Sequence, residues 1–211
     1  MISYAESKGI GTNLTTNGTL LEKHMEDIFR SGLREIAFGV YKGEILRKIL
    51  PQIERFSAER ERRGLKRPRL YFDITLYEGN AGEVVEMVKL APEIGVDAVI
   101  LHRLFNVYGV PPEAECLSDE EEERLFRELQ ELARRLKLEL YLPPKHTYPC
   151  RIVKRGVFVA VDGRVTPCTY LLDEGLGNAL DRGLREILRS EEYRKFVRDM
   201  KEHPICSRCR W

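Results

Sequence analysis

The stretch LYFDITLYEGNAGEVVEMVKLAPEIGVDAVIL, residues 70–101, decides the fold class of this chain. It opens with the mostly apolar and aromatic run 70–76 and closes with the compact apolar run 98–101, and both are typical of strands buried in a parallel sheet. Between them, Asn80 precedes a segment whose valines within 84–88 share one helical face. A strand, a helix and a strand in this order predict a parallel β–α–β unit.

The same alternation continues from this unit toward both ends of the chain. We expect further strands at 10–15, 35–40 and 138–142, with helices between them. The helix after the second strand contains Pro51, which predicts an interruption or a restart. Five strands separated by helices form either a small doubly wound sheet or an incomplete barrel, and the pattern alone does not choose between them. Residues 1–143 are therefore predicted to be an α/β domain.

The composition changes after the Pro-Pro pair at 143–144, and residues 144–211 are predicted to form a second, small α+β domain rich in cysteine. Residues 157–167 predict a β-hairpin, because two strand-like runs flank an Asp-Gly pair that suits a tight turn. Two short helices are expected within 182–201. This domain has few apolar residues to bury, so a bound metal would supply stability that its core lacks.

Charge and hydropathy narrow the possible function classes. The chain has 35 Lys and Arg residues against 34 Asp and Glu residues, and this balance argues against a nucleic-acid binder with a broad phosphate-facing surface. No apolar stretch reaches the roughly 18 residues of a membrane span, and the first residues lack the order of a signal peptide. We expect a cytoplasmic protein that binds neither nucleic acid nor membrane. A charged content of 33% with only two glutamines indicates a thermophilic source.

Four of the five cysteines form the pattern on which the functional prediction depends. Cys206 and Cys209 form a Cys-x-x-Cys pair, whose two thiolates can reach one metal from a single loop. Cys150 precedes the predicted hairpin and Cys168 follows its second strand, so the hairpin brings these two together. Four thiolates suit a [4Fe–4S] cluster or a structural zinc, and the spacing fits both equally. Cys116 has no spacing partner and is expected to be a small packed hydrophobe.

Two other uses of these cysteines remain open. A chain without an export signal favours metal or redox chemistry over disulfides, although the cytosol of thermophiles does contain disulfides. A thiol oxidoreductase fits less well, because the Cys-x-x-Cys pair does not lie at a strand–helix junction.

About 60 residues at the C-terminal end resemble the SPASM or twitch domain of radical S-adenosylmethionine (SAM) enzymes. The family's Cys-x(9–15)-Gly-x4-Cys pattern is met by Cys150, Gly163 and Cys168, with twelve residues in the first interval and four in the second. Cys206-x-x-Cys209 follows, and no further cysteines are present for a second auxiliary cluster. The resemblance implies one auxiliary [4Fe–4S] cluster on these four cysteines.

Residues 1–143 resemble, more loosely, the later part of the (β/α)6 barrel of the same enzymes. Residues 15–21 are similar to its third β/α step, and Thr75 followed by Asn80, together with 95–99, is similar to the fifth and sixth steps. The resemblance implies a partial radical SAM-type barrel. Members of the family associated with a tungsten cofactor are the most similar subgroup.

This resemblance also implies cofactor-binding residues. Thr16, Asn17 and Thr75 would line the cavity for SAM. Arg103, within the tract 101–106 at the end of the sixth barrel strand, would clamp a carboxylate or phosphate, with a surface ion pair as the alternative use of its guanidinium.

Radical SAM chemistry in this family needs a [4Fe–4S] cluster on a Cys-x3-Cys-x2-Cys motif, and no cysteine precedes Cys116. We therefore expect the C-terminal portion of a maturase that modifies a peptide or a cofactor, and no SAM cleavage by this chain alone. A first strand that is the third of a barrel has an unpaired edge, so the expected partner is the missing N-terminal half or a second copy. The alternative is a non-catalytic scaffold with a structural zinc on the same cysteines.

Overall fold

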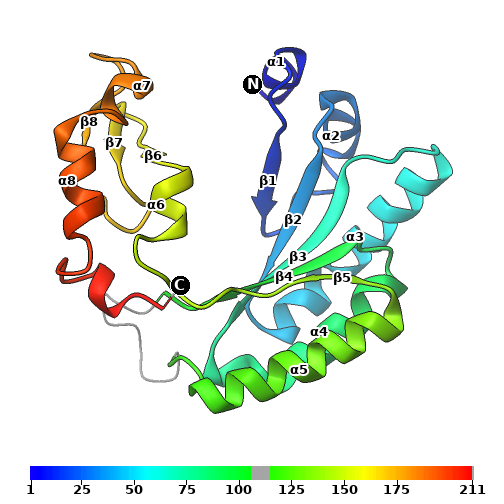
Figure 1. The fold of residues 1–211 in the computed structure, drawn as a ribbon. Coiled ribbons are helices and arrows are strands. Elements are labelled where there is room, and N and C mark those ends of the chain that lie inside the picture. The colour runs from blue at the N-terminus through cyan, green and yellow to red at the C-terminus, as the bar shows by residue number, and fades with distance from the viewer. Residues whose placement is uncertain (106–114, 211) are drawn as a thin grey trace. The chain divides into compact units, whose positions relative to one another are not determined.

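The computed structural model describes residues 1–105 and 115–210 of the chain (Figure 1). The chain divides into two compact units, Met1–Pro143 and Pro144–Trp211, and each is described here by itself.

The first unit is built on a five-stranded parallel sheet whose spatial order follows the chain, β1-β2-β3-β4-β5. A doubly wound sheet would reverse its strand order at a switch point, and no reversal occurs here. The sheet is that of an incomplete barrel, which settles the choice that the pattern left open. Its strands are β1 (Asn13–Thr16), β2 (Glu35–Val40), β3 (Arg69–Leu76), β4 (Ala98–Arg103) and β5 (Glu139–Tyr141).

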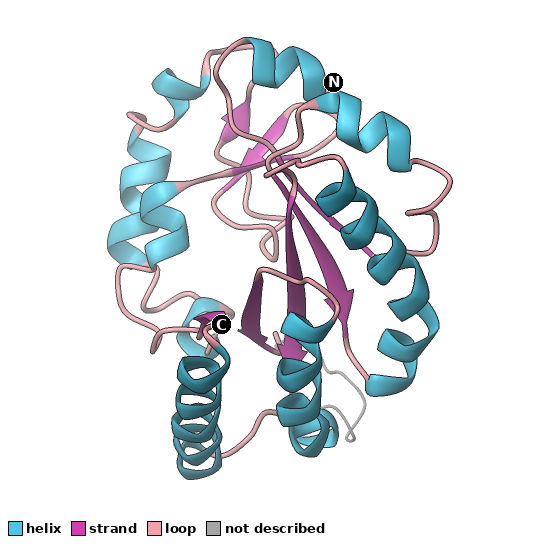
Figure 2. Ribbon diagram, turned by 90° about the vertical axis from the view of Figure 1, so that its right-hand side faces the viewer, coloured by secondary structure: helices cyan, strands magenta, loops and turns pink. Residues whose placement is uncertain are grey.

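Helices connect successive strands, and three of them, α3, α4 and α5, contact the sheet and pack in sequence along it (Figures 1 and 2). The long helix α5 begins at a capping box in which Ser118 and Glu121 each bond the other's backbone N–H. No helix among the described residues combines the length and apolar composition needed to cross a bilayer. The helices are α1 (Ile2–Ser7), α2 (Met25–Ser31), α3 (Gly43–Arg62), the 3-10 turn η1 (Glu78–Asn80), α4 (Ala81–Glu93) and α5 (Asp119–Leu136).

Side chains of the strands alternate between two different environments. One face of the sheet is apolar and is covered by the helices, and Phe38 on β2 and Phe72 on β3, which are paired in register, are fully buried there. The opposite face carries polar side chains toward the carboxyl ends of the strands. We call this the polar face and define it by Thr15, Asp73, Thr75 and His102.

Two local expectations for the first unit were wrong. Helix α3 runs without a break through Pro51, because Pro51 is exposed and water can reach the carbonyl left without a partner. The first strand begins at Asn13, three residues later than expected.

The second unit contains the predicted hairpin and one further strand. β6 (Phe158–Val159) pairs antiparallel with β7 (Arg164–Thr166), and β8 (Gly177–Asn178) adds to β7. Gly163 closes the turn at φ 82°, and a Cβ there would lie 2.5 Å from Asn178 Oδ1, so only glycine fits. The helical elements are α6 (Arg151–Arg155), α7 (Leu184–Ile187), α8 (Glu191–Asp199) and the 3-10 turn η3 (Cys206–Arg208).

Candidate metal centre and polar face

The Cys-x-x-Cys pair lies in a short turn that is held by one hydrogen bond within it and by others to Tyr148 and His203. The N–H of Cys209 donates to the carbonyl of Cys206 at 3.2 Å. The hydroxyl of Tyr148 donates to the same carbonyl at 2.6 Å. Nδ1 of His203 accepts from the N–H groups of Ile205 and Cys206, at 3.2 and 3.4 Å. These contacts fix the turn before any metal binds.

His203 has a larger role than the sequence indicated. Its side chain is only 16% exposed and its Nε2 lies 3.0 Å from a carboxylate oxygen of Glu174. One ring nitrogen thus holds the cysteine turn while the other meets the loop after β7. A polar side chain three residues before a turn can bond that turn's backbone, and this spacing was the signal in the sequence.

Cys150 and Cys168 are placed by the hairpin region. Cys150 is the N-terminal flanking residue of α6, and its N–H points at the sulfur of Met200, 3.3 Å away. Cys168 follows β7, and the Thr166 hydroxyl donates to its carbonyl at 3.0 Å. Each cysteine backbone is therefore fixed by its own local contacts.

Three of the four cysteines belong to or pack against one small apolar cluster, and Cys209 lies in the turn that begins at Cys206. Cys206 is buried, and Cys150 and Cys168 pack against the same group. Burial, together with the charges of the nearby thiolates of Cys209, Cys168 and Cys150, raises the pKa of Cys206 to about 11. None of the five cysteines, all of which lie within the described residues, forms a disulfide. The cluster's buried members besides Cys206 are Val153, Leu171 and Met200.

The donor set suits a metal centre that supplies positive charge. Burial also raises the pKa of Cys168, and a bound metal would deprotonate such thiols because it stabilises the thiolate. Among the residues that the structure describes, no three Cys, His, Asp or Glu side chains converge closely enough to ligate one metal ion. Tetrahedral zinc would need sulfurs about 3.8 Å apart, whereas a four-iron cluster distributes its thiolates over separate irons.

The polar face carries polar side chains from three strands. His102 Nε2 lies 3.3 Å from Asp73 Oδ1, and Thr15 lies on the same face of the sheet. Burial raises the pKa of Asp73, while the charge of His102 and the hydroxyl of Thr15 oppose that rise. A second set of contacts on this face, at the amino ends of the strands, joins Arg69 to Glu139 at 2.6 Å.

Three of the predicted cofactor-binding residues, Thr75, Thr16 and Asn17, lie in three different positions of the first unit. Thr75 lies on the polar face, in register with His102. Thr16 ends β1 in register with a fully buried residue of β2, on the helix-covered side. Asn17 is in the following turn, where its Oδ1 accepts from the N–H of Thr19 at 3.2 Å.

Arg103 is not brought together with these three. It lies on the helix-covered side, is only 6% exposed, and donates to both carboxylate oxygens of Glu122 on α5 at 2.6 and 2.7 Å. A third bond reaches the carbonyl of Pro143 at 3.2 Å. The ion pair is internal and links β4 to α5; a contact with a cofactor stays a prediction. Asn106, the end of the tract that contains Arg103, lies outside the described residues.

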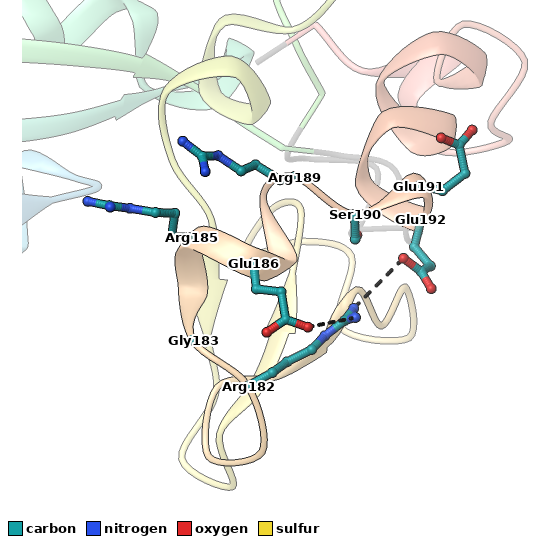
Figure 3. Close-up of a pocket in the computed structure, with 8 residues that line it drawn as sticks. All are labelled: Arg182, Gly183, Arg185, Glu186, Arg189, Ser190, Glu191 and Glu192. Atoms are coloured by element: carbon teal, nitrogen blue, oxygen red, sulfur yellow. Dashed lines mark ion pairs between the residues drawn. The ribbon is translucent and has the colours of Figure 1, made fainter.

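A separate open hollow of about 720 Å³ in the second unit has a structural explanation (Figure 3). Arg182 points into it and lies 3.8 Å from carboxylate oxygens of Glu186 and Glu192. The same guanidinium donates to the carbonyl of Leu176 at 3.1 Å. The hollow thus marks where one arginine joins α7, α8 and the segment before β8.

Comparison with known proteins assigns the second unit. Residues 150–210 match the SPASM family, described as an iron–sulfur cluster-binding domain. The four cysteines all lie within this match. A search of curated protein sequences found no match.

Solved structures assign the fold of both units. SuiB of Streptococcus suis bound to S-adenosylmethionine matches with a TM-score of 0.75 and 14% identity over 93% of this chain and 52% of that chain. SuiB bound to its precursor peptide SuiA matches with a TM-score of 0.74 and 13% identity, over 93% and 52%. Native anSMEcpe with bound AdoMet matches with a TM-score of 0.66 and 16% identity, over 90% and 59%. The chain spans about half the length of these proteins.

These findings define the fold of the chain and the family of one domain. Both units have the fold of the matching parts of SuiB and anSMEcpe. Residues 150–210 match the SPASM family, in the part of the chain where the motif around the four cysteines indicated it.

Proposed function

We propose that this chain supplies the C-terminal portion of a radical SAM maturase and carries one auxiliary [4Fe–4S] cluster on Cys150, Cys168, Cys206 and Cys209. The substrate is a peptide or a cofactor under maturation. The observation that carries the proposal is that Cys150, Cys168 and Cys206 share one small apolar cluster and that Cys209 lies in the same turn as Cys206, with none of the four in a disulfide. They lie within the match to an iron–sulfur cluster-binding domain.

One observation supports a cluster over a structural zinc. The description of the family that matches residues 150–210 names iron–sulfur cluster binding. A cluster of this kind, when bound, carries single electrons or ligates a group of the substrate.

The peptide substrate is supported by one of the structural matches. SuiB was solved with its precursor peptide SuiA, and this chain has the same fold over most of its length. We extend that substrate class to this chain as part of the proposal.

The proposal also holds that this chain cleaves SAM only together with a further polypeptide segment. None of its five cysteines forms a Cys-x3-Cys-x2-Cys motif. Within residues 1–105 and 115–210, β1 pairs with β2 alone, and Leu14 on β1 is 37% exposed. A sheet edge of this kind is a template for another strand, and the segment that carries the motif would extend the sheet there.

Anaerobic reconstitution with iron and sulfide tests the cluster. The proposal expects a brown protein with about four irons per chain, and a matched loss of iron in Cys206→Ala and Cys209→Ala. Cys116→Ala serves as the control and keeps the full iron content. A colourless protein with about one zinc per chain would instead establish the scaffold alternative.

Release of 5′-deoxyadenosine tests the requirement for a further segment. The reconstituted chain alone should release none, and addition of the segment that carries the motif should restore release. Cleavage of SAM by this chain alone, or assembly through β1 into a homodimer that cleaves SAM, would overturn this part of the proposal.

A further inference from the structure

We propose that His203 is a positioning residue for the cluster, which ties the Cys206–Cys209 turn to the loop after Cys168 and so holds the two pairs of cysteine ligands at one point. Its contact with Glu174 also keeps a carboxylate close to these ligands. This inference rests on the proposed function, because it assigns the residue that holds the ligands of that cluster. In this role His203 bonds the protein around the ligands and does not bind the metal itself.

The two ring nitrogens of His203 have opposite roles, and its hydrogen bonds assign them. Nδ1 accepts from the N–H groups of Ile205 and Cys206 at 3.2 and 3.4 Å. A nitrogen that accepts carries the lone pair, so the ring proton is on Nε2. Nε2 lies 3.0 Å from Oε1 of Glu174, and in this tautomer it donates to that carboxylate. One imidazole therefore joins two segments of the chain.

On the turn side, His203 begins the segment that carries the Cys-x-x-Cys pair. The carbonyl of His203 accepts from the N–H of Ser207 at 2.9 Å, while its Nδ1 accepts from the two preceding N–H groups. The turn then closes with the bond from the N–H of Cys209 to the carbonyl of Cys206. A side chain that bonds the backbone two and three residues later fixes a turn as a cap fixes the start of a helix. The backbone positions from which the two thiols project are thus set from His203.

On the loop side, Glu174 is connected to Cys168 by two consecutive turns. The N–H of Leu171 donates to the carbonyl of Cys168 at 3.1 Å, and the N–H of Glu174 donates to the carbonyl of Leu171 at 3.1 Å. Leu171 is buried in the small apolar cluster that also contains Cys206. The bond from His203 to Glu174 therefore completes a path of contacts between Cys168 and Cys206.

Met200 brings Cys150 into the same arrangement. The carbonyl of Met200 accepts from the N–H of His203 at 3.3 Å, and the N–H of Cys150 points at the sulfur of Met200, 3.3 Å away. Phe196 on α8 meets the ring of His203 edge to face, with 5.8 Å between the ring centroids. The orientation of the imidazole is thus fixed by packing as well as by its bonds, and every segment that carries a cysteine ligand is linked to it.

Glu174 also places a negative charge near the ligands. Burial and the neighbouring thiolates raise the pKa of Cys206, and the carboxylate of Glu174 adds to that rise. The bond from Nε2 of His203 holds the carboxylate at this place. Net charge around an iron–sulfur cluster tunes its reduction potential, and a negative charge opposes the arrival of an electron. Loss of this charge should therefore raise the potential.

The first test measures how firmly the chain retains its iron. The full chain is loaded anaerobically with iron and sulfide, and transfer of iron to EDTA is followed in the wild type and in variants of His203. His203→Leu loses both bonds of the ring and should release iron about 10- to 100-fold faster, the usual loss of metal affinity when a partner that orients the ligands is removed. His203→Asn keeps an acceptor near the position of Nδ1, and His203→Gln keeps a donor near that of Nε2. Both should release iron faster than the wild type and more slowly than His203→Leu.

These variants separate hydrogen bonding from packing. Leucine fills much of the space of the ring and offers no polar atom, so it would replace a residue that only packs at least as well as asparagine does. His24→Gln, at a histidine of the first unit, is the control and should release iron at the wild-type rate. Release at the wild-type rate from His203→Leu would overturn the inference. If His203→Leu fails to fold, wild-type rates in both His203→Asn and His203→Gln would overturn it.

The second test measures the reduction potential of the loaded chain by a redox titration followed by EPR. Glu174→Gln keeps an acceptor for the ring N–H and removes only the charge, so the iron content should stay and the potential should rise. The control, Glu202→Gln, removes an equal charge from the residue before His203 and should raise the potential less, since the ring bonds Glu174. An unchanged potential in Glu174→Gln would overturn the inference.

The outcomes separate this inference from the proposed function. If the wild-type chain takes up no iron, the proposed cluster fails and the role of His203 at that cluster fails with it. If the wild type holds about four irons and His203→Leu keeps them as firmly, the proposed function stands and the assignment of His203 is wrong.

Discussion

The two units of this chain are stabilised in different ways. The first contains one continuous apolar cluster that runs along the helix-covered face of the sheet, from Leu21 to Leu138. The second contains two separate clusters of only four and three buried residues, and one of these four is Cys206 itself. Small domains with so little apolar burial depend on a disulfide or a metal. Because the second unit buries so little apolar surface, we expect a metal bound to its cysteines to contribute much of its stability, whereas the first unit is stabilised by its apolar cluster.

Removal of the metal centre should separate the two units most strongly. Cys206→Ala combined with Cys209→Ala should abolish protection from hydrogen exchange in residues 144–211 and leave it intact in 1–143. Metal binding to small domains contributes on the order of 10 kcal/mol, which exceeds what the two small clusters can supply. Cys116→Ala in the first unit is the control. Full protection of 144–211 in the double variant would show that the second unit needs no metal.

The buried ion pair of the first unit should give the next largest effect. Glu122→Gln leaves the guanidinium of Arg103 buried without its counter-charge and should cost about 3–5 kcal/mol. Arg103→Met combined with Glu122→Leu should recover most of this loss, as measured by urea unfolding. Glu44→Gln, which breaks the exposed pair with Lys48, should change stability by less than about 1 kcal/mol. If Glu122→Gln lowers stability by no more than this control does, water already reaches Arg103.

Matched helix caps allow a smaller comparison between the units. Ser118 caps α5 and Ser190 caps α8, and each hydroxyl accepts a backbone N–H at 3.3 Å. Ser118→Ala should cost about 1 kcal/mol in the unfolding of 1–143. Ser190→Ala should cost a similar amount in 144–211 once the cluster is loaded. Asparagine at either position is the conservative control, and a loss confined to the wrong unit would contradict the division.

The smallest effect should be a dependence on pH in the first unit. Burial raises the pKa of Asp73 above its ordinary value near 3.9, so the folded chain binds more protons than the unfolded chain. Stability from this group therefore falls as pH rises from about 3.9 through the raised pKa, and is constant above it. Asp73→Asn should stabilise residues 1–143 at neutral pH and lose that advantage at low pH. Urea unfolding across this range checks the sign, with the exposed Glu131→Gln as control.

Local patterns were sufficient for most elements of the fold. The strand at 35–40, the β–α–β unit within residues 70–101 and the hairpin within 157–167 all occur where the sequence indicated them. These features depend on neighbours within a few residues, so local chemistry decides them. The strand β8 was not anticipated, because two residues become a strand only when β7 is beside them.

The candidate site divides in the same way. The motif spacing was enough to select the four cysteines, since their ligand chemistry and intervals are written in the chain. The spacing of motifs did not predict that Arg103 would pair with Glu122, nineteen residues away. Nor did it predict that His203 would bond the cysteine turn and contact Glu174. These pairings needed the folded coordinates.

By itself, the sequence determined the alternation of strands and helices and the family of the C-terminal domain. Both depend on the periodicity of apolar residues and on the spacing of motif residues along the chain, which can be read directly from the linear sequence. Only the tertiary structure decided which face of the sheet is polar at its carboxyl edge and which side chains meet there. Thr15, Asp73 and His102 belong to three strands separated by helices, and the parallel register places them on one face of the sheet, with His102 Nε2 3.3 Å from Asp73 Oδ1.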